Sequence, residues 1–414
     1  MKFRSLRGLT LTAAAGVFTM IVSACGGSSS TPTATATIPS GLSVSSFDVN
    51  FTPMPTLKDL TGAGKGLVGV LLPDTTSSTR YVNFDQPYLT KAFTDAGYSS
   101  SQFKIDNAQG NEATELAQAQ ADITQGATVL IMDPLNSTVG SQIQQLAQSK
   151  GVKLISYDRA TFTGTNTYYV SFDNVQVGKL IGQGFKDCVT AWGVKSPKVF
   201  TLNGGENSDP NAVSFAQGYN QVVWGSADTP QKVGTTNSDG YTLVGDQVAT
   251  DWNNTTGQTI FQQQYTAHPE INATIEANDG LGNAVINVLK AKGIKPKTIP
   301  TTGQDATLQG MENVLTGYQC GSVYKAVYLE AQDAVALATI LRAGLTPPPA
   351  LVNSTTKPPS GVSGTEQPAS LLTPIWVNAA NMGATVIKDK FVDAGALCQA
   401  VTAAVCQANN IPTS

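Results

Sequence analysis

Short apolar runs alternate with longer amphipathic segments from residue 66 onward. The apolar runs predict strands over residues 67–72, 103–106, 127–132, 152–156 and 168–172. Between them, apolar residues recur at helical spacing and predict helices over residues 84–96, 111–125 and 139–150. Strands that alternate with helices in this way predict a parallel sheet with helices on its faces.

A second series of the same kind begins at residue 175. It predicts strands over residues 198–202, 273–277, 298–302 and 322–324, and helices over residues 175–192, 211–223, 256–266, 281–292, 307–315 and 326–343. Residues 345–370 are rich in Pro, Ser and Thr and predict a long loop; residues 371–377 then return as a strand, and a C-terminal helix follows. Two such series predict an α/β protein with two lobes. Because ligands of open α/β sheets bind beyond the carboxyl ends of the strands, we expect a site in the cleft between the lobes.

The N-terminus has the pattern of an export signal. Positive residues come first, at Lys2, Arg4 and Arg7. The apolar run over residues 9–22 is about 14 residues long, which suits a signal peptide, whereas a membrane span takes about 20. The run ends in Val22-Ser23-Ala24-Cys25, which resembles the lipobox of bacterial lipoproteins. The alternative is an ordinary cleavage site beside an incidental cysteine.

The lipobox resemblance implies that a signal peptide over residues 1–24 is removed and that the Cys25 thiol is diacylated. Residues 25–65 then predict a flexible tether, because Gly, Ser, Thr, Pro and Ala dominate its first part. Two acyl chains suffice for stable anchoring. We therefore expect an extracytoplasmic protein, lipid-anchored to the outer face of the bacterial cell membrane or periplasmic.

Composition narrows the function further. Of the 414 residues 41% are hydrophobic and only 13% are charged, and a net charge of −4 gives no electrostatic footprint for nucleic acid. Four cysteines besides Cys25 form an even number, which favours disulfides in an exported chain: Cys188, Cys320, Cys398 and Cys406. Three pairings are possible; the short separation favours Cys398 with Cys406, which leaves Cys188 with Cys320. With a single histidine, His268, and no CxxC motif, the sequence predicts no metal site and no cofactor.

Polar residues recur in short segments close to the ends of the predicted strands. These segments are SSTRY at residues 77–81, ISYDR at 155–159, VSFDN at 170–174, GG at 204–205 with Asp209 and Asn211, Trp252, ANDG at 277–280, GQDA at 303–306, VYK at 323–325 and LLTP at 371–374. In this order they resemble the type I periplasmic sugar-binding proteins of ABC transporters, in the xylose-binding and multiple-monosaccharide-binding branch. The resemblance implies two Rossmann-like lobes with parallel sheets, joined by a three-stranded hinge. The N-terminal lobe would comprise residues 66–172 and 325–371, and the C-terminal lobe residues 173–324 and 372–414.

The resemblance also implies a set of ligand-binding residues: Arg80, Tyr81, Asp158, Arg159, Asp209, Asn211, Trp252, Asn278, Asp279, Gln304, Asp305 and Lys325. Their chemistry suits a sugar, because carboxylates, amides and guanidinium groups pair with hydroxyls while aromatic rings cover the C–H faces. A helix cap is the alternative role for Asp209 and Asp279, and a structural ion pair at the hinge is the alternative for Lys325.

The function implied is that of a monomeric binding protein for a monosaccharide, xylose or a related aldose, with the permease and ATPase subunits of an ABC importer as partners. A sugar sensor that acts on a membrane receptor is the alternative among binding proteins. A glycoside hydrolase is the alternative among enzymes, but each candidate carboxylate has a basic or amide neighbour, which lowers its pKa and disfavours a general acid. We therefore expect a protein that is not an enzyme.

Overall fold

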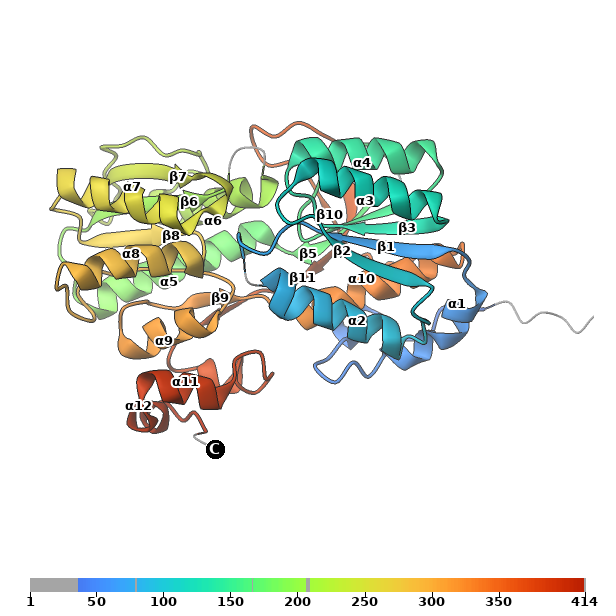
Figure 1. The fold of residues 1–414 in the computed structure, drawn as a ribbon. Helices are drawn as coiled ribbons and strands as arrows, with labels where there is room; N and C mark the ends of the chain where they lie inside the picture. Colours follow the sequence, from blue (N-terminus) through green and yellow to red (C-terminus); the bar gives the residue numbers. More distant parts are fainter. Residues whose placement is uncertain (1–35, 79, 166, 206–208, 413–414) are drawn as a thin grey trace, which may run out of the picture. The chain divides into compact units, whose positions relative to one another are not determined.

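The computed structural model describes residues 36–78, 80–165, 167–205 and 209–412, so the predicted signal peptide and Cys25 lie outside the described residues. A first α/β lobe is built on a seven-stranded sheet in the order β10-β11-β5-β4-β3-β1-β2 (Figure 1). Its strands are β1 (Leu67–Leu72), β2 (Phe103–Asn107), β3 (Ala127–Met132), β4 (Lys153–Tyr157), β5 (Thr167–Phe172), β10 (Ser354–Thr356) and β11 (Gln367–Leu372). Neighbouring strands are parallel except for the antiparallel pair β10 and β11. This confirms the parallel sheet predicted from the first series of apolar runs.

Helices cover both faces of this sheet. α3 (Glu112–Thr124) and α4 (Ser137–Ser149) pack on one face, and α2 (Gln86–Asp95) and α10 (Val327–Arg342) pack on the other (Figure 1). α4 begins where the Asn136 side chain accepts hydrogen bonds from the Thr138 and Val139 amides, which caps the helix. The buried apolar residues of α3 and α4 then face the sheet at helical spacing.

The predicted tether over residues 25–65 is wrong for its second part. Residues 36–65 include η1 (Val44–Ser46), η2 (Met54–Leu57) and α1 (Lys58–Ala63), and the buried side chains there are Leu42, Phe47, Phe51, Met54, Leu57 and Leu60. These residues cover the outer side of α10, which is buried along nearly its whole length. Gln332 of α10 donates to the Asp48 carbonyl at 2.8 Å, and Arg342 donates to the Thr61 carbonyl at 2.8 Å. A helix that is buried all round needs such a cover, and this segment supplies it.

The second lobe has a parallel sheet in the order β7-β6-β8, with β6 (Lys198–Gly204), β7 (Thr242–Ala249) and β8 (Ala273–Glu276). The remaining strands of the lobe, β9 (Ser322–Tyr324) and β12 (Ile375–Val377), form an antiparallel pair. The helices of the lobe are α5 (Asn174–Ala191), α6 (Pro210–Trp224), α7 (Asn254–Ala267), α8 (Asp279–Ala291) and α9 (Leu308–Thr316). The sequence analysis missed β7, an edge strand that interrupts its apolar residues with Gly245, Asp246 and Gln247.

The strand predicted over residues 298–302 is wrong. This segment lies beside β8, and the Thr274 amide donates to the Pro300 carbonyl at 2.9 Å. The next positions of the ladder are taken over by side chains: the Glu276 amide donates to Thr302 Oγ1, and the Thr302 amide donates to Glu276 Oε2, each at 2.8 Å. Pro300 has no N–H to donate, so regular pairing stops there.

The long loop predicted over residues 345–370 is also partly wrong, because β10 and most of β11 lie within it. The strand predicted over residues 371–377 is instead the end of β11 followed by β12, separated by Pro374. The chain passes between the two sheets three times, after β5, after β9 and after β11. These are the places that the family resemblance implies for the hinge.

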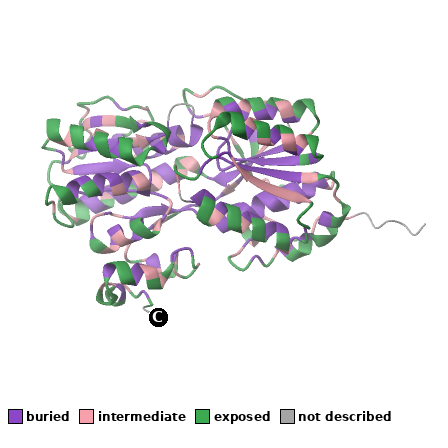
Figure 2. Cartoon of the chain, viewed as in Figure 1, coloured by how far each residue is buried: buried purple, intermediate pink, exposed green. Residues whose placement is uncertain are grey.

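Both favoured disulfide pairings are present. Cys188 of α5 is bonded to Cys320 just before β9, and Cys398 of α11 (Ala394–Val401) is bonded to Cys406 of α12 (Ala403–Ala408). Assigning residues 372–414 to the second lobe is incomplete, because residues 378–412 pack against α9 and also against the first lobe. The central strands of both lobes are buried (Figure 2). Among the described helices, none is both long and apolar enough to cross a membrane.

Candidate functional site

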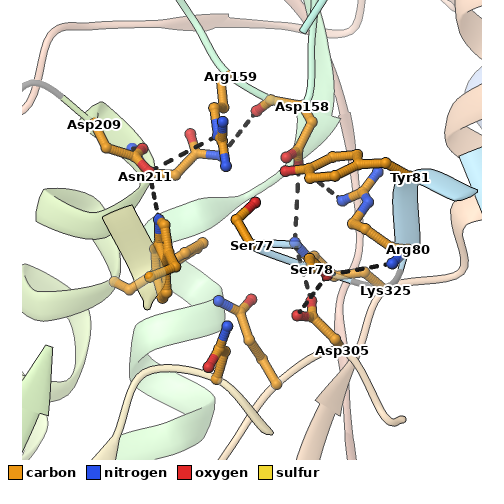
Figure 3. A pocket seen from close by; sticks show the side chains of 14 residues that line it. Ser77, Ser78, Arg80, Tyr81, Asp158, Arg159, Asp209, Asn211, Asp305 and Lys325 are labelled. Atoms are coloured by element: carbon orange, nitrogen blue, oxygen red, sulfur yellow. Dashed lines mark hydrogen bonds and ion pairs between the residues drawn. The ribbon is translucent and has the colours of Figure 1, made fainter. Parts of the chain in front are cut away.

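A cavity lies where residues from both lobes meet, beyond the strand ends (Figure 3). Eleven of the twelve residues predicted from the sequence line it: Arg80, Tyr81, Asp158, Arg159, Asp209, Asn211, Trp252, Asn278, Gln304, Asp305 and Lys325. Ser77, Ser78 and Phe215 complete the lining. The fold therefore brings together residues that lie up to about 250 positions apart in the chain, as the sequence analysis predicted.

Arg80 is surrounded by acceptors of its own lobe. Its Nε and Nη2 donate to the two oxygens of Asp85 at 2.9 and 2.8 Å, and Nη2 also donates to Glu330 at 2.7 Å. Nη1 donates to Asp158 Oδ1 at 2.8 Å. Four hydrogen bonds thus use most of the five N–H groups that a guanidinium has. Arg80 lines the cavity, yet most of its donor capacity already holds carboxylates in place.

Asp158 is ionised at neutral pH. Burial alone would raise the pKa of its carboxyl group, but the nearby positive charges of Arg80, Lys325 and Arg159 outweigh burial and lower the pKa to about 2. Both close cation contacts fall on Oδ1, with Arg80 at 2.8 Å and Lys325 at 3.7 Å. Among the described residues, no group donates to Asp158 Oδ2, so this oxygen remains an acceptor for a ligand.

Arg159 is buried but poorly satisfied. The only hydrogen bond of its side chain to a described residue goes from Nη1 to the Pro134 carbonyl at 3.2 Å. Its Nε lies 3.9 Å from Asp133 and 3.8 Å from Asp209, beyond hydrogen-bond range of both carboxylates. The Tyr81 ring lies between the two arginines, with its centroid 5.7 Å from each guanidinium carbon. Arg159 therefore keeps unused donors at the cavity.

The second lobe contributes the opposite wall. Asp209 caps α6 by accepting from the Asn211 amide at 3.0 Å, and its Oδ2 accepts from Trp252 Nε1 at 2.8 Å. The Trp252 ring covers Gly204 so closely that a Cβ there would lie 1.9 Å from a ring atom, which only glycine allows. Asn211 reaches across to the first lobe and donates to the Asp158 carbonyl at 2.9 Å. One carboxylate, that of Asp209, thus caps α6 and also lines the cavity.

Lys325 sits at the hinge, directly after β9. Its Nζ lies 3.7 Å from Asp158 and 3.6 Å from Asp305, and it makes no hydrogen bond to a described residue although it is only 5% exposed. Nearby, Gln304 Oε1 is buried and has no hydrogen-bond partner among the described residues. A buried polar group without a partner costs about 1–3 kcal/mol, so these groups favour a polar ligand that pairs with them.

The predicted role of Asp279 in the site is wrong. Its carboxylate does not line the cavity and is held by four donors of its own lobe, from Gln319, Ser322 and both the amide and hydroxyl of Thr307. Burial raises its pKa to about 7. The residue before it, Asn278, caps α8 by accepting from the Leu281 amide. Asp279 therefore joins the start of α8 to the start of α9 and to β9.

Three lining residues and one residue behind the cavity were missed. Ser77 and Ser78 precede Arg80 in the segment SSTRY, and Phe215 follows Asn211 by one helical turn, so spacing could have found all three. Asp133 follows β3 directly; it is fully buried, and neither carboxylate oxygen has a hydrogen-bond partner among the described residues. Its position after a strand was the available signal for it.

The charges that line the cavity balance. Three cations, Arg80, Arg159 and Lys325, face three carboxylates, Asp158, Asp209 and Asp305. Within the described part of the chain, no three His, Cys, Asp or Glu side chains are grouped so that they could hold a metal ion. An equal number of positive and negative side chains suits an uncharged ligand with many hydroxyl groups, because hydroxyls both donate and accept.

Comparison with known proteins places the chain in a family. The family described as periplasmic binding protein domain matches residues 68–345. The chain is 32% identical to the D-xylose-binding periplasmic protein of Escherichia coli over 288 residues, which cover 69% of this chain and 80% of that protein. It is 28% identical to the multiple sugar-binding periplasmic receptor ChvE of Rhizobium radiobacter over 342 residues, covering 81% of this chain and 93% of that protein.

A solved structure supports the fold. The ABC transporter solute binding protein from Clostridium phytofermentans, solved with bound β-D-glucose, superposes with a TM-score of 0.68 at 23% identity and covers 80% of this chain and 99% of that chain. Together, the matched residues and the two-lobe architecture show that this chain belongs to the periplasmic binding protein domain family.

Proposed function

We propose that the protein captures an uncharged monosaccharide, D-xylose or a related aldose, in this cavity and delivers it to the permease of an ABC importer. The observation that carries the proposal is the unused hydrogen-bonding capacity of two buried cations. The side chain of Arg159 makes one hydrogen bond to a described residue and that of Lys325 makes none, although a guanidinium has five donors and an ammonium three. Sugar hydroxyls and the ring oxygen would supply the missing acceptors.

The balanced charge of the lining supports a neutral ligand over an anionic one. The rings of Tyr81, Phe215 and Trp252 supply apolar surface for the C–H faces of a sugar. The names of the xylose-binding and multiple sugar-binding relatives agree with this chemistry. Binding rather than hydrolysis fits the site, because a carboxylate with a pKa of about 2, such as Asp158, cannot act as a general acid near neutral pH.

Calorimetry against a sugar panel tests the proposal. We expect D-xylose or another aldose to bind with a dissociation constant near micromolar, about −8 kcal/mol, because a few charge-assisted hydrogen bonds exceed the cost of association. D-glucuronate should bind at least about tenfold more weakly than D-glucose, because its carboxylate upsets the charge balance. Folded protein that binds no monosaccharide would refute the proposal.

A matched pair of lysine variants links binding to the cavity. Lys325→Met should weaken the best sugar about tenfold or more, whereas Lys290→Met, on the exposed side of α8, should leave the affinity unchanged. Equal losses in both variants would place the sugar elsewhere. Sugar uptake by cells that lack the protein would then separate import from a receptor role, since a sensor is not needed for uptake.

We propose further that the protein is lipid-anchored through Cys25. The motif Val22-Ser23-Ala24-Cys25 supports this, and acyl chains would keep the protein near its permease. Cys25→Ser should move the protein from the membrane fraction to the soluble extracytoplasmic fraction. If the variant stays on the membrane as the wild type does, the anchor lies elsewhere.

A further inference from the structure

Residues 378–412, which we name the C-terminal clasp, are held together as a small unit. They contain η5 (Met382–Ala384), α11 and α12, with the Cys398–Cys406 disulfide between the two helices. Met382 and Val386 are fully buried. α11 and α12 pack on α9 of the second lobe, and the apolar cluster that joins the clasp to Met311 and Val314 of that helix continues into the core of the first lobe. The clasp is therefore anchored on the second lobe (Figure 1).

The same clasp also contacts the first lobe. Phe391 stacks on Phe84, with ring centroids 4.0 Å apart and an interplanar angle of 14°. Asp389 Oδ2 accepts from the Tyr328 hydroxyl at the start of α10 at 2.9 Å, and from the Tyr324 hydroxyl of β9 at 3.2 Å. The contact is thus apolar at its centre, with a carboxylate fixed beside the hinge strand.

Phe84 belongs to the turn that carries the site. The π-helical turn η3 (Tyr81–Asp85) follows Arg80 directly, and it contains Tyr81, Phe84 and Asp85, the main partner of Arg80. A movement of Phe84 therefore moves Tyr81 and the acceptors that orient Arg80. The clasp touches this turn from a segment that is anchored on the other lobe.

Other contacts show that the lobes meet in this conformation. Asn211 of the second lobe donates to the Asp158 carbonyl of the first at 2.9 Å, and Ser78 Oγ lies 3.5 Å from Asp305 Oδ2. Polar contacts such as these can be exchanged for contacts with water when the lobes separate. Water cannot replace the contact between the stacked rings of Phe84 and Phe391 in that way, because separation of the lobes exposes both apolar rings to water.

We propose that the C-terminal clasp is a fourth connection between the lobes, and that Phe391 is a positioning residue that acts through Phe84 to favour the closed cleft. The three hinge crossings allow the lobes to rotate, whereas the clasp stabilises one end of that rotation. A protein whose binding-competent form is only partly populated binds its ligand more weakly by that fraction. The clasp thus raises the apparent affinity for the ligand without contacting it.

Matched substitutions of two stacked phenylalanines test this role. Phe391→Leu removes a ring contact between lobes, and Phe93→Leu removes the contact of Phe93 with Phe103, whose centroids are 4.6 Å apart within the first lobe. Small-angle scattering of the sugar-free protein should show a larger radius of gyration, and so a larger open fraction, for Phe391→Leu alone. Phe93→Leu should lower the melting temperature without changing the radius.

The second test, a measurement of sugar affinity in the same variants, rests on the proposed function. For a monosaccharide that binds the wild type, the dissociation constant of Phe391→Leu should rise about three- to tenfold, by the same factor by which the closed fraction falls. Phe84→Leu should give a similar loss, and the loss in the double variant should be clearly smaller than the sum of the two single losses, because both substitutions remove the same Phe84–Phe391 stack. An unchanged radius in Phe391→Leu, or additive losses in the double variant, would overturn the proposal. If no sugar binds at all, the proposed function fails, while the scattering comparison still decides the role of the clasp.

Discussion

Arg80 and Arg159 are both buried at the same cavity, yet their surroundings differ. Arg80 makes four hydrogen bonds to three carboxylates of its own lobe, whereas Arg159 makes one, to the Pro134 carbonyl. Around Arg159 the nearest carboxylates stay 3.8 Å and 3.9 Å away. Charge and burial alone do not distinguish the two side chains. They differ in the number of guanidinium hydrogen bonds that are already made to the protein. We infer that Arg80 mainly organises the site, and that Arg159 mainly meets the ligand.

The largest effect is expected at Arg80. Arg80→Met should lower the free energy of unfolding by about 3–5 kcal/mol, because it leaves Asp85 buried without its cation and takes from Asp158 the nearer of its two ion-pair partners. Urea denaturation followed by circular dichroism measures this change. A loss below about 1 kcal/mol would show that the carboxylates do not depend on Arg80, and the contrast with Arg159 would disappear.

At Arg159 we expect the opposite result, a large effect on sugar binding and a small effect on stability. Arg159→Ala should weaken sugar binding about tenfold to a hundredfold, as expected for a lost charge-assisted hydrogen bond, while unfolding free energy changes by about 1 kcal/mol. Calorimetry and denaturation on the same preparation give both numbers. The interpretation fails if Arg159→Ala unfolds the protein but the residual folded fraction binds sugar normally.

Glu276 shows what burial does to a carboxylate without an arginine. Burial raises its pKa to about 8, whereas Arg80, Lys325 and Arg159 bring that of buried Asp158 to about 2. Because the folded-state pKa of Glu276 lies above its unfolded value of about 4.5, its contribution to stability is present below pH 4.5 and is lost as the pH rises toward 8. Stability of the wild type should therefore fall between pH 5 and pH 8, and Glu276→Gln should reduce this fall by about 3–4 kcal/mol. Equal pH slopes in the two proteins would contradict the shift.

A substitution at Trp252 tests the contrast between Arg80 and Arg159 through the smallest expected effect. Its indole N–H donates to Asp209 Oδ2, the oxygen that lies 3.8 Å from Arg159. Trp252→Phe should free Asp209 to turn toward Arg159, so that Arg159 becomes satisfied as Arg80 is. We expect sugar affinity to fall about three- to tenfold while the melting temperature stays equal or rises. A lower melting temperature with unchanged affinity would mean that the indole serves packing alone.

Sequence patterns predicted much of the fold because the buried strands are short apolar runs. β1 and β3 have the predicted bounds, Leu67–Leu72 and Ala127–Met132, and nearly every residue in them is buried. The strand predictions failed where the pairing of backbone segments does not follow the hydrophobicity of the sequence. Residues 298–302 look like a strand, but Pro300 and two side chains replace the ladder, and β7 is an edge strand with polar residues. The tether predicted over residues 25–65 is wrong from residue 36 onward, because the Gly/Ser/Thr-rich start of that segment outweighs in composition the six apolar side chains that are buried after it.

The candidate site was predicted by family resemblance and strand ends, and its lining agrees for all but Asp279. Resemblance points to positions, but it does not say how many partners each side chain has. The cage of Asp85 and Glu330 around Arg80 joins residues 250 positions apart through Glu330, and no local pattern marks it. Such counts of donors and acceptors require the three-dimensional structure.

The Cys188–Cys320 bond encloses a sequence separation of 132 residues, which includes most of the second lobe. A chain pulled from its two ends extends by at most about 3.4 Å per residue, so the bond conceals roughly 450 Å of contour length. Under tension the second lobe can lose its packing without lengthening the chain by that amount. Single-molecule extension should therefore show a shortfall of this size, which disappears once the bond is reduced.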